Sequence, residues 1–264
     1  MTSHPPAPAA AIASDSAELT PDQVAMRDAY IRARGYWKPW TEGLLRMSPN
    51  FLNAYAAYAG HPAAHGPLSP LMCELIYVAL DGSGTHLFES GLKLHMRLAL
   101  ERGATPLQVI EVLHLATMQG LDGVALGLDI LVEELEAVGQ SLPPPDPAHA
   151  AQRAAYEARF GDWPIFCERM LRLDPPYFAV MLDLLSCREA GEGLDEKTRA
   201  LLSVALSSCF TELAADAARL HIRRALRLGA TREELLQVLQ MTAHLGVHAC
   251  SIGVPALTEV LARR

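Results

Sequence analysis

The chain repeats itself once. The segment LKLHMRLALERGAT at 92–105 returns as ARLHIRRALRLGAT at 218–231, which places His221 126 residues after His95. The same offset aligns further identical residues on both sides without an insertion: Tyr30 with Tyr156, Gly35 with Gly161, Trp37 with Trp163, Pro49 with Pro175, Gly120 with Gly246 and Leu131 with Leu257. Self-similarity at a fixed period predicts repeated structural units, here a tandem duplication.

Prolines mark the boundary between the two copies. The segment SLPPPDPAHA at 141–150 stops a helix and favours a semi-rigid spacer. We therefore expect a first domain at 21–140 and a second at 151–264. Residues 1–20 lack a basic stretch before an apolar run and contain several prolines, which favours a disordered tail over a secretory signal.

Each copy is predicted to be entirely helical, with about six segments. The chain is 50% hydrophobic but only 6% aromatic, and it is rich in Ala and Leu, which lose little rotamer freedom in helices. Capping boxes are predicted at Thr20, Thr105 and Thr231, and Gly103 and Gly229 suit the left-handed position that ends a helix. We also expect a helix at 85–102 and ion pairs within helices, Glu42 with Arg46 and Glu168 with Arg172.

The charge balance and the cysteines limit the partners and the compartment. The 30 acidic and 22 basic residues give a net charge of −8 without a basic run, which disfavours nucleic acid and anionic membranes. Charged residues or histidines interrupt every apolar stretch, so no membrane span is expected. The five cysteines form no C-x-x-C pair and indicate reduced thiols in a cytoplasmic protein.

The histidine that both copies keep is the leading candidate for chemistry. His95 lies on the apolar face of its predicted helix, and small residues, Gly91 and Ala99, stand one turn before and after it. His221 has Ala217 and Ala225 at the same places. This pattern fits a core histidine at a tight helix crossing, or a histidine in a pocket that works as a general acid or base. We favour the second interpretation.

Each copy resembles a carboxymuconolactone decarboxylase or AhpD-like domain. The resemblance rests on LH-x-R-x-AL-x-x-GAT at 94–105 and 220–231, preceded by the Leu/Ala-rich helices at 73–80 and 200–206. It implies an all-α fold, a homo-oligomer (a trimer of two-repeat chains, or a dimer) and a site around the motif histidine. Glu74 matches the glutamate that joins the proton relay of AhpD-like proteins if a two-residue insertion is allowed, whereas the second copy has Ala200.

The chain departs from both branches of this resemblance. The AhpD-like C-x-x-C is replaced by Phe88 and Gly91 in the first copy, and by Ala214 and Ala217 in the second. Thiol peroxidases need a reactive thiolate with a resolving partner, so this activity is disfavoured. The glutamate that the decarboxylase branch places four residues before its histidine is also absent.

A histidine and a glutamate precede the motif histidine in the first copy only. His86 and Glu89 lie one turn apart, and Glu89 is a candidate acid partner for His95, although a solvated helix start explains it equally. His86 with Glu89, or His244 with His248, lacks a third metal ligand at diagnostic spacing, so no metal or other cofactor is expected. Glu111 and His114 are replaced by Gln237 and Gln240 in the second copy, and this asymmetry fits either a first copy that alone is catalytic or neutral drift of the surface.

The sequence therefore favours a cofactor-free lyase of the decarboxylase type, acting on a small carboxylated or lactone metabolite. His95 is expected to shuttle the proton and Glu74 or Glu89, with His86 nearby, to orient or share it. His221 is either a second active centre or a relic. The alternatives are an AhpD-like antioxidant protein and a non-catalytic oligomer that binds a small acid or a protein.

Overall fold

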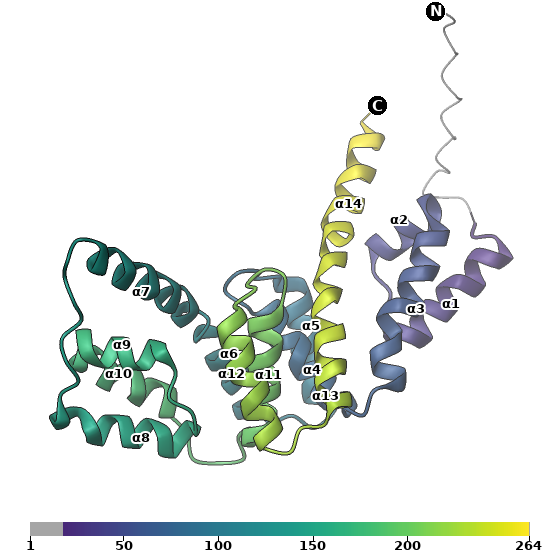
Figure 1. Ribbon diagram of the computed structural model, residues 1–264. Helices are drawn as coiled ribbons and strands as arrows, with labels where there is room; N and C mark the ends of the chain where they lie inside the picture. The colour runs from purple at the N-terminus through teal and green to yellow at the C-terminus, as the bar shows by residue number, and fades with distance from the viewer. Residues whose placement is uncertain (1–17, 264) are drawn as a thin grey trace, which may run out of the picture. The chain divides into compact units, whose positions relative to one another are not determined.

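The computed structural model describes residues 18–263, and within them every regular element is a helix (Figure 1). The first repeat contains seven α-helices: α1 (Pro21–Arg34), α2 (Pro39–Met47), α3 (Pro49–His65), α4 (Pro70–Asp81), α5 (Glu89–Glu101), α6 (Pro106–Thr117) and α7 (Gly120–Ala137). The second contains seven more: α8 (Ala150–Phe160), α9 (Ile165–Leu173), α10 (Pro175–Ser186), α11 (Glu196–Ser208), α12 (Ala215–Arg227), α13 (Arg232–Thr242) and α14 (His248–Ala262). Two short 3₁₀ helices, η1 (Pro147–His149) and η2 (Ala243–Val247), precede α8 and α14. The all-α tandem fold is confirmed, with seven α-helices per repeat rather than six; the predicted tail lies outside the described residues except for 18–20.

The predicted helix boundaries are largely confirmed. The capping boxes at Thr20, Thr105 and Thr231 all form, with each side chain accepting from the backbone N–H three residues on. Gly103 and Gly229 have positive φ angles of 95° and 83°. Pro143, Pro144 and Pro145 lie between α7 and η1, and Pro147 begins η1.

The helix that carries His95 begins later than predicted. Residues 82–88 form a turn in place of the first helical residues, because Leu87 has a φ of 48°, which a continuous right-handed helix does not allow. The Phe88 N–H donates instead to the Asp81 carbonyl at 2.8 Å. The second repeat reproduces this turn with Leu213 at a φ of 54°.

The helices divide into two compact units whose limits differ from those of the repeats. Among the described residues, the terminal unit combines 18–65 with 246–263, and the central unit spans 66–245. In the terminal unit, α14 of the second repeat packs on α2 of the first. A Cβ on Gly43 of α2 would lie 2.6 Å from Val254 of α14, so glycine permits this approach. Tyr30, Leu45 and Leu52 complete the core of the unit.

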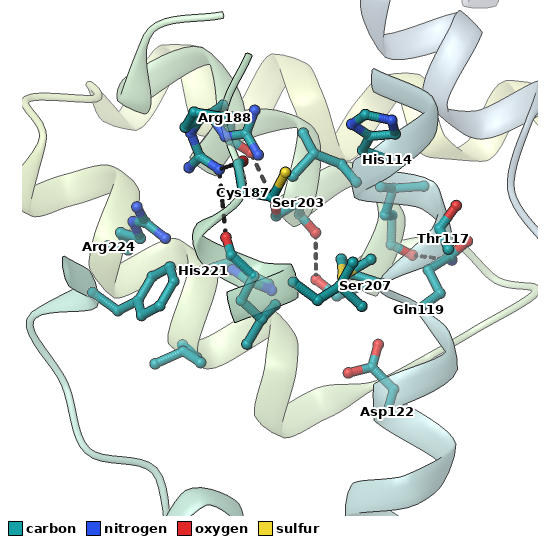
Figure 2. Close-up of a pocket in the computed structure, with 18 of the residues that line it drawn as sticks. His114, Thr117, Gln119, Asp122, Cys187, Arg188, Ser203, Ser207, His221 and Arg224 are labelled. Atoms are coloured by element: carbon teal, nitrogen blue, oxygen red, sulfur yellow. Dashed lines mark hydrogen bonds between the residues drawn. The ribbon is translucent and has the colours of Figure 1, made fainter. Parts of the chain in front are cut away.

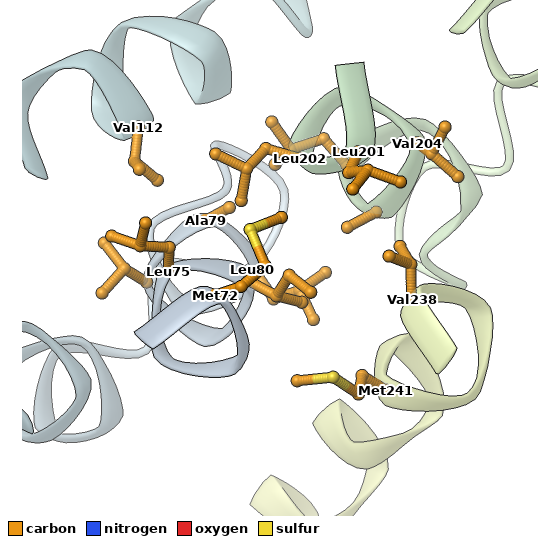
Figure 3. Close-up of a cluster of buried hydrophobic side chains, with 14 of the residues drawn as sticks. Met72, Leu75, Ala79, Leu80, Val112, Leu201, Leu202, Val204, Val238 and Met241 are labelled. Atoms are coloured by element: carbon orange, nitrogen blue, oxygen red, sulfur yellow. The ribbon is translucent and has the colours of Figure 1, made fainter. Parts of the chain in front are cut away.

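In the central unit, both repeats build one apolar core. It combines α4, α6, α11 and α13 and contains Met72, Leu80, Val112, Leu202 and Met241 (Figure 3). Burial of such side chains contributes about 1.5–3 kcal/mol each. The core of the central unit therefore exists only when the two repeats pack together.

Within the central unit, pairs of equivalent contacts relate the helices of the two repeats by approximate two-fold symmetry. The Leu68 N–H donates to Gln237 Oε1 at 2.8 Å, and the equivalent Leu194 N–H donates to Glu111 Oε2 at 2.6 Å. Thr85 even hydrogen-bonds its own counterpart, Thr211, at 3.0 Å. In each case, a side chain on a core helix of one repeat accepts a hydrogen bond from the loop that precedes a core helix of the other repeat.

A smaller cluster of the central unit joins α7 to the helices that open the second repeat. Leu128 of α7 packs with Tyr156 and Phe178, and α7 contacts α9 (Figure 1). The arrangement matches α14 on α2 in the terminal unit. In both cases, the last helix of one repeat packs on the second helix of the other.

One of the two predicted ion pairs is wrong. Arg46 pairs with Glu42 at 2.7 Å, as expected. Arg172, in contrast, donates to the Pro143 carbonyl at 2.6 Å and so holds the proline-rich spacer. Glu168 accepts from the Trp163 indole at 2.8 Å, as Glu42 does from Trp37 at 3.2 Å, so the repeats share the tryptophan contact rather than the ion pair.

Candidate functional site

The first-repeat centre is a histidine–carboxylate pair between α4 and α5. His95 Nδ1 lies 2.7 Å from Glu74 Oε2, and the two side chains are only 12% and 11% exposed. Arg102 approaches the other carboxylate oxygen of Glu74 at 3.4 Å. A carboxylate on Nδ1 fixes the tautomer and the orientation of the imidazole ring. The structure thus brings together Glu74 and His95.

An aromatic side chain and a second histidine extend this centre. Tyr77, one turn after Glu74 on α4, stacks on the His95 ring with centroids 4.5 Å apart. Its hydroxyl lies 2.7 Å from Nδ1 of His244, a buried residue of η2 in the second repeat. The sequence analysis missed Tyr77, although its i, i+3 spacing from Glu74 is a usable signal. The contact with His244 depends on how the repeats pack, which local spacing does not reveal.

The other two residues predicted for the first site have different surroundings. Glu89 is exposed at the start of α5, and its carboxylate pairs with Lys93 on the same helix, which lowers the pKa of Glu89. His86 is half-buried in the turn before α5, and burial lowers its pKa. The carboxylate that contacts His95 is that of Glu74, so the geometry does not support Glu89 as its acid partner.

The small residue before His95 serves close packing. A Cβ on Gly91 would lie 2.2 Å from Asp81 Oδ2 and 2.6 Å from the Phe88 ring. Asp81 is buried at the end of α4, and its burial raises its pKa to about 8. Gly91 therefore admits a buried carboxyl group and a phenyl ring beside α5 rather than opening a pocket.

The second-repeat histidine has different neighbours. Ala200 and Ser203 of α11 occupy the places that Glu74 and Tyr77 hold in the first repeat. His221 lines a cavity of about 430 Å³. Figure 2 shows Arg188 and Arg224 on the same side of this cavity as His221. The second repeat therefore has a pocket of the kind that we expected at the motif histidine.

Residues from both repeats form the walls of this cavity. Those from the first repeat are His114, Leu115, Thr117, Met118, Gln119 and Asp122. Those from the second are Tyr156, Phe160, Leu184, Leu185, Cys187, Arg188, Glu189, Arg199, Ser203, Leu206, Ser207, Leu220, His221 and Arg224. Sequence reasoning singled out only His221 here as a candidate site residue. The others come from six helices and the loops beside them, so no local motif reveals them.

Electrostatics distinguish the two ends of the cavity. At the His221 end, burial and then the Arg224 guanidinium lower the pKa of His221 to about 4, so its imidazole is neutral at pH 7. At the opposite end in Figure 2, burial and then the charge of Glu212 raise the pKa of Asp122 to about 6. The cavity thus pairs a basic end with a weakly acidic end.

The cysteines offer no reactive pair to either centre. All five are free thiols, and Cys73, Cys167 and Cys209 are buried. Burial raises the pKa of Cys167 to about 12, which opposes thiolate formation. Cys187 lines the cavity without a C-x-x-C partner.

The comparisons with known proteins place this geometry in a family. A model described as the Carboxymuconolactone decarboxylase family matches residues 49–130 and 175–262, which together exceed half of the chain. The chain belongs to the carboxymuconolactone decarboxylase family. The two matched segments are the two repeats, and they carry the two different histidine centres described above.

A solved structure supports the family and the fold. A Burkholderia xenovorans LB400 protein, whose designation as a gamma-carboxymuconolactone decarboxylase subunit is provisional, is 33% identical to this chain. The match covers 92% of this chain and 98% of that one, with a TM-score of 0.86. In the comparison with curated proteins, none matches this sequence.

Proposed function

We propose that the protein is an acid–base enzyme of the decarboxylase type whose catalytic centre is the His95–Glu74 pair. The supporting observation is the 2.7 Å contact between His95 Nδ1 and Glu74 Oε2, with Arg102 on the other carboxylate oxygen. This arrangement fixes the orientation and the tautomer of the imidazole, as a general acid or base requires. The residues present suffice for proton transfer, so the proposal includes no cofactor.

The substrate class that fits this centre is a small carboxylated or lactone metabolite. In a decarboxylation, the bond to the carboxylate carbon breaks, CO₂ leaves, and the electron pair stays on the substrate, delocalised towards its carbonyl group. A proton must then reach the substrate carbon, and the imidazole of His95 supplies it. In an isomerisation, the same imidazole removes one proton and returns it at another carbon. Both reactions use one proton shuttle.

The test follows CO₂ release from γ-carboxymuconolactone and related carboxylated lactones by the wild-type chain and by His95→Gln. We expect the variant to lose about 100-fold or more of kcat/KM, within the usual range for a general acid or base. Glu74→Gln should lower kcat more than it changes KM. The matched control is His221→Gln, which removes the second-repeat equivalent and should keep most of the activity.

Two outcomes contradict the proposal. Full activity of His95→Gln, with helicity and assembly intact by circular dichroism and light scattering, removes His95 from the mechanism. A wild-type chain that decarboxylates and isomerises none of these lactones removes the substrate class.

We also propose that the chain forms a homo-oligomer in the cytoplasm, either a trimer or a dimer. The last helix of each repeat exposes apolar side chains at equivalent positions: Leu126 and Ile252 are each 65% exposed, and Leu131 and Leu257 are 48% and 46% exposed. Apolar surface repeated in this way is typical of contacts between copies.

Two helical stretches, Pro106–Ala137 and Arg232–Ala262, are long and apolar enough to cross a membrane by length and composition. Each comprises two helices with a break between them, and the first of each pair, α6 or α13, contributes to the core of the central unit. We therefore propose further copies of the chain, rather than lipid, as the cover for α7 and α14. Light scattering of Leu126→Glu and Ile252→Glu tests this, and an unchanged mass would contradict it.

A further inference from the structure

The cavity beside His221 has more positive than negative groups at its basic end. Arg159, Arg188 and Arg224 share one carboxylate, that of Glu196, at 2.7, 3.3 and 2.5 Å. Arg199 lies 3.3 Å from Glu111. Four guanidinium groups therefore meet two carboxylates, and the further acid at this end, Glu189, is exposed. Because uncompensated charge in a partly desolvated site is unfavourable, the excess favours an anionic ligand.

The two arginines that line this end keep donors for such a ligand. Arg224 uses Nη2 for Glu196, and its guanidinium carbon lies 5.0 Å from the centre of the Phe160 ring. Arg188 contacts Glu196 through Nη2 and the carbonyl of Cys187 through Nη1. A guanidinium has five N–H donors, so these contacts leave others on both arginines.

The remaining walls define the rest of the ligand. Apolar side chains of Phe160, Leu184, Leu185 and Leu220 line the cavity on the second-repeat side. The imidazole of His221 adds a polar group that is neutral at pH 7. A fully hydrated inorganic anion gains nothing from apolar walls, whereas an organic acid with an apolar body buries that body against them.

We infer that the His221 cavity is a binding site for a small organic acid, distinct from the His95–Glu74 centre. The carboxylate of the ligand contacts Arg224 and Arg188, and its apolar body lies along Phe160 and Leu220. Ser203, which lines this cavity, stands where the first repeat has the bulkier Tyr77. This site is independent of the proposed decarboxylase activity.

Calorimetric titration of the full-length chain with benzoate tests the inference. Benzyl alcohol serves as the neutral analogue and inorganic phosphate as the anion without an apolar body. We expect benzoate to bind more tightly than either, and Arg224→Gln to weaken benzoate about tenfold or more. The matched control, Arg97→Gln, removes an exposed arginine that pairs with Glu101 and should change the affinity less than twofold.

A second variant keeps the inference falsifiable if Arg224→Gln disturbs the ion pairs. Ser203→Tyr introduces the side chain that the first repeat carries at the equivalent position, and it should abolish benzoate binding by filling the cavity. Binding that survives Ser203→Tyr, phosphate binding as tight as that of benzoate, or no binding of benzoate by the wild-type chain would each overturn the inference. His95→Gln should bind benzoate normally, which separates this result from a failure of the proposed activity.

Discussion

The two copies of the motif histidine occupy equivalent helix positions in unlike surroundings. His95 lies against Glu74 and beneath the Tyr77 ring, whereas His221 lies opposite Ala200 and Ser203 and beside a cavity. The backbone that carries them is the same in both repeats, down to a leucine with positive φ before each helix. The comparison teaches that two side chains on the preceding helix decide whether the histidine joins a relay or lines a cavity.

The largest stability effect should come from the contacts that tie the repeats together. Glu111→Ala removes the carboxylate partner of the buried Arg199 and the acceptor of the Leu194 N–H. We expect a loss of about 3–5 kcal/mol in the free energy of unfolding, because the guanidinium stays buried without its partner.

The equivalent change in the other repeat, Gln237→Ala, removes a neutral amide and should lose only about 1–3 kcal/mol. Urea unfolding of both variants measures the difference. Equal losses would show that the ion pair of Glu111 with Arg199 adds no stability beyond that of the neutral contact of Gln237.

A smaller effect is expected at the position one turn before each histidine. Gly91→Ala forces Asp81 and the Phe88 ring to move and should lower stability by about 1–3 kcal/mol. Ala217→Gly only adds backbone freedom, with a loss of about 0.5–1 kcal/mol. Thermal unfolding compares the two, and a Gly91→Ala chain as stable as the wild type would argue against tight packing beside His95.

The smallest effect concerns the acidic end of the His221 cavity. Asp122 has a folded pKa of about 6, above its ordinary value of 3.8. The folded state therefore holds this proton more tightly than the unfolded state does, and stability from this group is lost as the pH rises from about 4 to 6.

Replacing Asp122 with Asn should remove this loss. Relative to Asp122→Asn, the wild type should become less stable over that range by about 1 kcal/mol or less, since solvent screens a half-exposed group. Thermal melts at pH 4, 5, 6 and 7 follow the difference, with the exposed Asp216→Asn as the control. A difference that does not vary with pH would contradict the raised pKa.

Local signals in the sequence predicted most of the fold. Caps such as Thr105, and glycines such as Gly229, act through their own neighbours in the chain, so their outcome is independent of tertiary packing. The start of α5 was predicted too early because the Leu87 turn breaks a pattern that otherwise reads as helix. Arg172 was assigned to Glu168 by spacing, but the proline-rich spacer provides carbonyl acceptors that spacing alone does not show.

The candidate site was predictable only where it is local. Glu74 and His95 came from a motif on consecutive helices, and the structure joins them. Arg188, Arg199 and Arg224 come from three separate parts of the second repeat, and the cavity that they line also needs α6 and α7 of the first. Which acidic groups lie beside these arginines depends on how the helices pack, so the sequence alone does not reveal their charge balance.

The shared core of the central unit has a consequence for how the chain folds during synthesis. α4 packs against α11 and α13 of the second repeat. The apolar side chains of α4 that face these two helices therefore stay uncovered until residues beyond 230 have left the ribosome. Contacts this distant in sequence slow folding and leave the first half exposed to aggregation meanwhile. A single copy of the repeat would need a second chain to complete this core, so having both copies on one chain replaces an encounter between molecules by a step within one.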